Sequence, residues 1–205
     1  MTDTRVPAAS PPRPPGRPRS ATADEAIREA AAELLAEHGF EALCVDDVAE
    51  RARVSKSTIY RRHPSKVDLV MDVAEGLCYA KRPPPPDTGR VRDDLVGYLR
   101  SLIEFLTSTT AGRMIPALVA ATRQNPDLAL AHRRFVDSRR VEIKAVLRRA
   151  VERGELRRDA DVEVFVDLLA GAVFYRFLVS HGRLDESFAD AVVDALLRGF
   201  GRTGG

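Results

Sequence analysis

Apolar residues recur at intervals of three and four along nearly the whole 205-residue chain, and this spacing constrains the fold more than any other feature. Such intervals place side chains on one face of an α-helix. The stripes occur over Ile27–Leu35, Val45–Ala52, Leu69–Leu77, Val91–Leu106, Ile143–Val151 and Phe188–Phe200. The sequence lacks the short alternating segments bounded by glycine that indicate strands. We therefore predict an all-α fold.

Proline-rich segments divide the chain. Residues 1–20 hold six prolines and four arginines, a composition that does not pack into a core, so we expect a flexible basic arm there. The run Pro83–Pro86 interrupts the helical pattern a second time. We interpret it as the connection between a head of about four helices over 21–82 and a body of about five helices over 83–205.

Charge is unevenly distributed in the predicted head. Residues 21–50 contain nine acidic side chains and one basic side chain, whereas residues 51–67 contain six basic side chains and no acidic one. A polyanion would be attracted to the second segment and repelled by the first. Basic clusters are also common on ordinary solvated surfaces, so charge alone leaves both interpretations open.

The segment Val45–His63 has the pattern of a helix-turn-helix. Ala49 is the small residue required where two helices cross, and the apolar residues that would lock the helices together are Val48, Ala52, Val54 and Ile59. This spacing leaves a set of side chains facing outward on the second helix: Lys56, Ser57, Thr58, Tyr60, Arg61 and Arg62. Such side chains suit contacts with bases, phosphates and sugars, so the segment is predicted to bind DNA.

The same region resembles the head of the TetR family of transcriptional regulators. The similarity lies in ELLAEHGF (33–40), DDVAERA (46–52) and VSKSTIYRRHPSK (54–66). The resemblance implies that the head binds operator DNA and that the body contains a small-molecule pocket and a homodimer interface. It also implies the family's usual mode of action, which is repression relieved by an effector.

Candidate DNA contacts follow from this resemblance and from the outward-facing positions. By position, the resemblance implies contacts from Ser55, Lys56, Ser57, Thr58, Tyr60 and Arg61, with Lys66 on a backbone phosphate at the start of the fourth helix. Arg53 and Arg62 are two further candidates. In the arm, Arg17 and Arg19 flank a proline that keeps the backbone extended, so they either enter an A·T-rich minor groove or belong to a tail that only aids solubility.

Three positions depart from the family pattern. Arg53 stands where the family usually has a turn glycine, so an arginine is expected to adopt a left-handed conformation. Cys44 stands where the family usually has a Ser or Thr that caps the second helix. Without that cap we expect the helix to be less stable by about 1 kcal/mol. The pair Arg62-His63 replaces a histidine-aromatic pair, so that Arg62 is a candidate to read a base and the packing of His63 is left open.

The segment 161–180 is apolar on nearly every side and therefore needs cover on every side. This cover could come from within a monomer, if the segment were its central core helix, or from a second subunit. We expect the second, a homodimer interface formed by the helices near 161–180 and 186–200. Arg176 within this segment would pair with an acid across the dimer or meet an anionic ligand.

Candidate effector-binding residues are large apolar side chains of the body, each of which could equally be ordinary core. They are Leu102, Phe105, Leu106, Met114, Leu118, Phe135, Phe165, Leu169, Phe174 and Tyr175. His132 and His181 form no cluster with metal-ligand spacing, and we expect both at the surface.

Other functional classes find little support in the sequence. Cys44 and Cys78 do not form a metal or disulfide pattern, and no signal peptide or membrane span is indicated, so we expect a cytoplasmic protein without metal or cofactor. Phosphate-loop and nucleophile-elbow motifs are missing, which argues against an enzyme. An effector-independent architectural DNA-binding protein and, less favoured, an enzyme with an unrecognised site are the alternatives.

Overall fold

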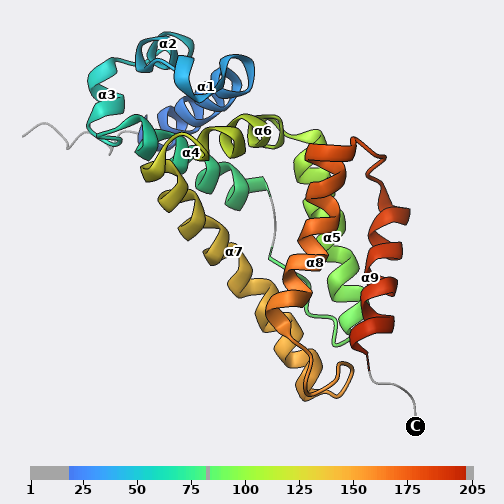
Figure 1. Cartoon of the computed structure of the whole chain (residues 1–205). Coiled ribbons are helices and arrows are strands. Elements are labelled where there is room, and N and C mark those ends of the chain that lie inside the picture. Colours follow the sequence, from blue (N-terminus) through green and yellow to red (C-terminus); the bar gives the residue numbers. More distant parts are fainter. Residues whose placement is uncertain (1–18, 82–83, 202–205) are drawn as a thin grey trace, which may run out of the picture.

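A computed structural model describes residues 19–81 and 84–201, and within these ranges the chain is helical (Figure 1). The elements are α1 (Arg19–Ala42), α2 (Val45–Arg51), α3 (Lys56–Tyr60), α4 (Lys66–Lys81), α5 (Val91–Ser108), α6 (Thr110–Thr122), α7 (Pro126–Glu152), α8 (Val162–Tyr175), the π-helical turn η1 (Arg176–Ser180) and α9 (Glu186–Phe200). The predicted all-α fold, with a head of four helices and a body of five, is confirmed.

Most helix ends lie where the sequence signals place them. Ser65 and Asp68 form a capping box at the start of α4, because the Ser65 N–H donates to the Asp68 carboxylate at 3.0 Å and the Asp68 N–H donates to Ser65 Oγ at 3.1 Å. Asn125 Oδ1 accepts from the Leu128 N–H at 2.9 Å, and Pro126 occupies the first turn of α7.

The first helix begins earlier than the sequence indicates. Its first turn is at Arg19, inside the expected arm, so Arg19 belongs to α1. Because extending an existing helix costs less free energy than nucleating a new one, the residues just upstream continue α1 by one turn. At the other end Gly39 has φ +77°, which interrupts the helical path three residues before the end of α1.

The core is continuous between head and body. Helix α1 packs against α4 and also along α6 of the body, while α4 contacts α6 and α7. Ile27, Leu35, Leu69, Leu95 and Leu118 are all fully buried in this core. In the described part of the chain, no helix is both long and apolar enough to cross a membrane.

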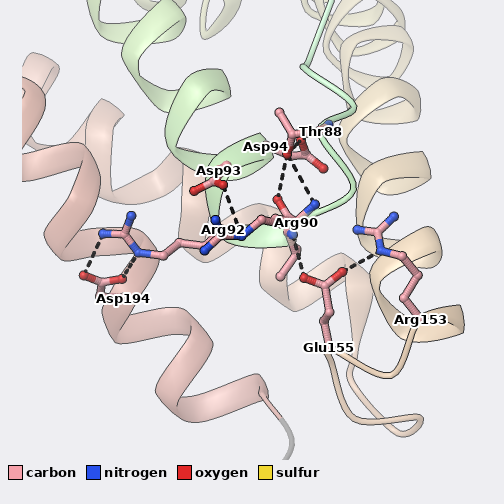
Figure 2. A network of polar contacts seen from close by, with 9 residues as sticks. Thr88, Arg90, Arg92, Asp93, Asp94, Arg153, Glu155 and Asp194 are labelled. Atoms are coloured by element: carbon pink, nitrogen blue, oxygen red, sulfur yellow. Dashed lines mark hydrogen bonds and ion pairs between the residues drawn. The ribbon is translucent and has the colours of Figure 1, made fainter.

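Polar contacts fasten the start of α5, the first helix of the body (Figure 2). Asp94 is fully buried, and one of its carboxylate oxygens accepts from both the N–H and the hydroxyl of Thr88 at 2.7 Å. Glu155 accepts from the Val91 N–H at 2.7 Å, and Arg92 binds Asp194 of α9 at 2.7 Å. The start of α5 is thus bound to the preceding residue Thr88, to Glu155 between α7 and α8, and to Asp194 of α9.

Helix α8 packs against α5, α7 and α9, yet one of its faces stays uncovered. The side chains of Val164, Leu168, Tyr175 and Val179 lie along that face and are 45–63% exposed. Their spacing of four and seven residues forms one apolar stripe. The single chain therefore does not cover the segment that the sequence predicted to need cover on all sides.

Within the single chain, Arg176 contacts an aromatic ring and a backbone carbonyl. Its guanidinium lies 3.7 Å from the centroid of the Phe188 ring and donates to the Arg183 carbonyl at 2.7 Å. The aromatic face and the carbonyl both favour a cation, so within the chain Arg176 joins the end of α8 to α9.

Candidate nucleic-acid interface and body cavity

Helices α2 and α3 cross as the sequence pattern predicts. Val48 and Ala49 of α2 and Ile59 of α3 are buried at the crossing. After α2, the Val54 N–H donates to the Ala49 carbonyl at 2.9 Å and the Arg53 N–H donates to the Glu50 carbonyl at 3.1 Å. This pair of bonds is the Schellman motif, which requires a left-handed residue at the position of Arg53.

Two of the departures have the expected structural consequences. Arg53 has φ +54°, so an arginine occupies the left-handed position that normally takes glycine. Its side chain is exposed and forms no ion pair with any described residue. Cys44 caps α2 with extended backbone but without a side-chain hydrogen bond. The turn is therefore formed at some cost in stability and presents an additional cation.

The first turn of α3 carries three hydroxyl groups close together. Ser55 Oγ accepts from the Thr58 N–H at 3.3 Å and so caps α3, and it lies 2.9 Å from both Ser57 Oγ and Thr58 Oγ1. Lys56 Nζ is 2.6 Å from Asp46 Oδ2, a hydrogen bond that raises the pKa of the lysine. Ser55, Lys56 and Ser57 are exposed, so this turn is accessible to a phosphate.

Tyr60 and Arg61 lie on the exposed side of the same helix. Tyr60 is 53% exposed, so its ring and hydroxyl are accessible to a partner. Arg61 is exposed and forms no ion pair with any described residue. Together with Lys56 and Arg53, these side chains form one accessible surface, which we call the α3 face.

Arg62 does not face outward, contrary to the prediction. Its Nε lies 2.8 Å from Asp24 Oδ1 on α1, and both side chains are about three-quarters buried, with 25% and 26% exposure. A carboxylate on a neighbouring helix attracts the guanidinium away from solvent, and periodicity within α3 cannot reveal that partner. Arg62 thus joins α3 to α1.

Lys66 is also bound within the head. Its Nζ donates to the carbonyls of Phe40 and Glu41 at 2.9 and 3.1 Å and lies 4.6 Å from the centroid of the Phe40 ring. A cation is favoured there because the last carbonyls of a helix carry partial negative charge. The structure therefore gives Lys66 the function of capping α1, and its expected phosphate contact stays a prediction.

His63 is buried beside a second ion pair of the head. Arg28 of α1 binds both carboxylate oxygens of Asp72 of α4 at 2.9 and 3.1 Å, and this bond raises the pKa of Arg28. His63 Nε2 lies 3.8 Å from the same carboxylate. Arg28 also covers Gly76, where a Cβ atom would come within 2.4 Å of its Nε. Helices α1 and α4 are thereby held in close contact.

The expected minor-groove contacts cannot be compared with the structure. Arg17 lies outside the described residues, and for Arg19 only the backbone is described.

A partly open cavity of about 320 Å³ lies between α4 of the head and α5, α6, α7 and α8 of the body. Six of the predicted effector-binding residues line it: Leu102, Phe105, Leu106, Met114, Phe135 and Phe174. Four do not. Leu118 and Leu169 are fully buried in the core, Phe165 packs edge-on against Phe200 at 5.0 Å, and Tyr175 is 60% exposed on the α8 stripe. These four point to other faces of their helices.

Several cavity residues were not predicted. Ala74 and Cys78 come from α4 of the head, and Tyr98, His132 and Arg139 add polar groups to an otherwise apolar wall. His132 was expected at the surface, but it lines the cavity, and burial lowers its pKa. A spacing signal existed, because His132, Phe135, Val136 and Arg139 lie at three- and four-residue intervals on one face of α7.

Comparison with known proteins gives consistent matches over both parts of the chain. The protein-family model described as "Bacterial regulatory proteins, tetR family" matches residues 27–73. A second family model, described as "Tetracyclin repressor-like, C-terminal domain", matches residues 85–196. The chain is 40% identical over 182 residues to an uncharacterized HTH-type transcriptional regulator, YdeS, of Bacillus subtilis (strain 168), covering 88% of this chain and 91% of that protein.

Two further proteins extend the comparison. The DNA-binding transcriptional repressor TetR of Mycobacteroides abscessus is 31% identical over 183 residues, covering 87% of this chain and 94% of that protein. The TetR family transcription regulator SCO0332, whose crystal structure is known, is 37% identical in sequence to this chain. The two structures match with a TM-score of 0.67, covering 86% of this chain and 97% of that chain.

Fold and site together define a DNA-binding transcriptional regulator that uses a helix-turn-helix. The family matches cover head and body in the order in which they occur here. The chain belongs to the TetR family of transcriptional regulators. The predicted family and the predicted regulatory function are thereby confirmed.

Proposed function

We propose that this regulator is a repressor that binds its operator as a homodimer and is released by a small molecule bound in the body cavity. The observation that carries the proposal is the α3 face, where Tyr60, Arg61 and Lys56 are exposed on a helix whose opposite side is locked by buried Ile59. A helix anchored in this way can enter the major groove with its polar side toward the bases.

The uncovered stripe of α8 supports dimerisation. Val164, Leu168, Tyr175 and Val179 would lose their solvent contact against the same stripe of a second copy, with α9 beside it. A two-fold interface of this kind is isologous and self-complementary. It would set the two α3 helices at a fixed separation, and two half-sites one turn apart require about 34–36 Å.

The position of α4 supports regulation by a ligand. This helix contributes Ala74 and Cys78 to the cavity wall and Asp72 to the ion pair with α1. A ligand that displaces α4 would therefore move the head relative to the body. DNA affinity would fall by the ratio of the ligand's affinities for the free and the DNA-bound conformations.

The test begins with selection of duplexes from a random pool by the full-length protein, together with binding to the DNA upstream of its own gene. The expected result is a palindromic sequence that binds two protomers per duplex, measured by light scattering of the complex. Addition of a ligand of the cavity should then release the duplex.

A pool that yields no preferred sequence, with weak and equal binding to all duplexes, would contradict the proposal. It would favour the architectural alternative, whose binding falls with salt but shows no sequence preference.

A further inference from the structure

The cavity wall carries a buried arginine at one end. Arg139 of α7 is a cavity-lining residue whose side chain is 9% exposed. Arginine stays charged in proteins, so Arg139 presents a fixed positive charge to whatever occupies the cavity. We propose that the cavity binds an amphipathic organic anion, with its acidic group at Arg139 and its apolar part directed toward α4. This inference rests on the proposed function of the cavity as an effector site.

The present counter-charge of Arg139 lies to one side of the cavity. Glu142, one helical turn further along α7, approaches the two terminal nitrogens at 3.2 and 3.3 Å and is 32% exposed. The guanidinium is thus more deeply buried than the carboxylate with which it pairs. Glu142 does not line the cavity. The cation is therefore the charge that faces a ligand at this end.

The polar and apolar groups are segregated along the cavity. Helix α7 begins beside the head and runs away from it (Figure 1). Arg139 therefore lies about 10 Å farther from the head than His132, at 1.5 Å per residue. Helices α5 and α8 run toward the head. Tyr98 is the first cavity residue along α5 and Val166 the first along α8, so both line the same distant half.

The half of the cavity next to the head is apolar or weakly polar. Its walls include Ala74 and Cys78 of α4 and Met114 and Ile115 of α6. A hydrocarbon or aromatic group is favoured there by burial. A ligand that satisfies both ends must carry its charge at one end only.

An anion suits the distant end better than a cation. Arg140 follows Arg139 and also lines the cavity, while its partners Asp167 and Glu163 on α8 are 63% and 58% exposed. A cationic ligand would meet two guanidinium groups. A carboxylate, by contrast, can bind a guanidinium through two parallel hydrogen bonds.

Cavity volume limits the size of the ligand. A water-sized group occupies about 30 Å³ in the liquid, so 320 Å³ holds about ten non-hydrogen atoms. Octanoate has this size and polarity, and 1-octanol and octylamine are matched in chain length but differ in charge. These three compounds are the probes for the test.

Binding of the three probes to the full chain is measured by isothermal titration without DNA. Octanoate is expected to bind at least about tenfold more tightly than either of the other two, which corresponds to about 1.4 kcal/mol. Arg139→Met should abolish the preference for octanoate over 1-octanol, and Arg139→Lys should keep most of it. Arg133→Met removes an exposed arginine from the same helix and should leave the preference unchanged. Ala170→Leu, which fills the cavity, should weaken binding of all three probes.

The inference is overturned if 1-octanol or octylamine binds as tightly as octanoate, if none of the probes binds the wild type, or if folded Arg139→Met retains the preference. Because no DNA is present, these outcomes are independent of operator binding. A chain that selects a palindrome but shows no preference for octanoate would keep the proposed function and lose only the ligand class.

Discussion

Head and body both use arginine, but in opposite environments. In the head, Arg61 and Arg53 are exposed on or beside a five-residue helix, where a large external polyanion can reach them. In the body, Arg139 is buried in an apolar cavity, where only a small ligand fits. In the two proposed sites the same side chain would serve surface recognition in one region and recognition within a cavity in the other, and packing decides between the two.

The difference also separates what each region contributes to binding. An exposed cation adds an electrostatic attraction that salt weakens. A buried cation acts at short range and selects its partner by shape and charge together. We therefore expect a change at exposed Arg61 to alter DNA affinity with little effect on the fold, and a change at buried Arg139 to alter the binding of a small ligand.

The largest expected effect concerns the α8 stripe. Leu168→Glu places a charge in the proposed dimer interface and should convert the protein to a monomer. Binding to a two-half-site duplex should weaken at least about 30-fold, since a central interface residue contributes about 2 kcal/mol or more. Val141→Glu is the matched control, because Val141 is 62% exposed on α7. Light scattering and anisotropy measure both effects. A Leu168→Glu dimer with full affinity would contradict this interface.

Arg61 and Arg62 provide a comparison between adjacent residues within the head. Arg62→Ala and Asp24→Ala should each destabilise the fold, and a double-mutant cycle should give a coupling of about 0.5–1.5 kcal/mol. Arg61→Ala should change the free energy of unfolding by less than about 0.5 kcal/mol, because it is an exposed position. Urea denaturation gives these values. A coupling near zero would mean that the Arg62–Asp24 pair does not hold α3 on α1.

Two helix ends with the same hydrogen-bond pattern differ in one residue. Gly154 ends α7 as Arg53 ends α2, with Glu155 N–H to Ala150 carbonyl at 2.9 Å and φ +75°. Arg53→Gly should stabilise the fold by about 0.5–1 kcal/mol, and Gly154→Ala should destabilise it by a similar amount. The Arg53→Gly protein should also bind DNA more weakly. A less stable Arg53→Gly protein would show that the left-handed arginine is not strained.

The smallest expected effect is a pH dependence in the body. Burial lowers the pKa of His132 from its ordinary 6.5, so the unfolded chain binds this proton at a higher pH than the folded chain does. Its contribution to stability is complete above pH 6.5 and is lost as the pH falls through the lowered pKa. His132→Leu should flatten the decrease in melting temperature at acid pH, whereas His38→Leu at an exposed position should not. Equal curves for all three proteins would argue against burial of this group.

Much of the fold could be predicted from the sequence because local signals determine it. The capping box at Ser65, the cap at Asn125 and the left-handed turn at Arg53 each depend on residues within a few positions of one another. The start of α1 was placed too late, because helix extension upstream depends weakly on any single residue.

The site was predicted where it lies on one helix and missed where several helices form it. Tyr60 and Arg61 are exposed on α3 as expected, whereas Arg62 turns toward Asp24, a partner that lies on another helix. Spacing indicates which residues face inward, but it does not indicate where packed helices leave space. Leu118 and Leu169 were therefore assigned to a cavity that they do not line, and Ala74 and Cys78 of the head were not considered.

Arg139 is an instructive intermediate case. It lies on the same face of α7 as Phe135 and Ile143, which are four residues before and after it and are both buried. A charged residue within an apolar stripe is a signal that can be found in sequence, because it requires either a partner or a ligand. The large number of arginines in the chain obscured it.

We propose that position, rather than total charge, makes the α3 face a DNA-binding surface. The most direct test is the affinity of Arg61→Ala and Arg133→Ala for the selected duplex, measured by fluorescence anisotropy over a range of salt concentrations. Both variants remove one exposed positive charge, from the C-cap of α3 and from α7 respectively. We predict that Arg61→Ala binds about tenfold or more weakly, with a salt dependence reduced by about one phosphate contact, and that Arg133→Ala binds as the wild type does. Equal losses in the two variants would contradict the account, because they would show that the DNA responds to net charge alone.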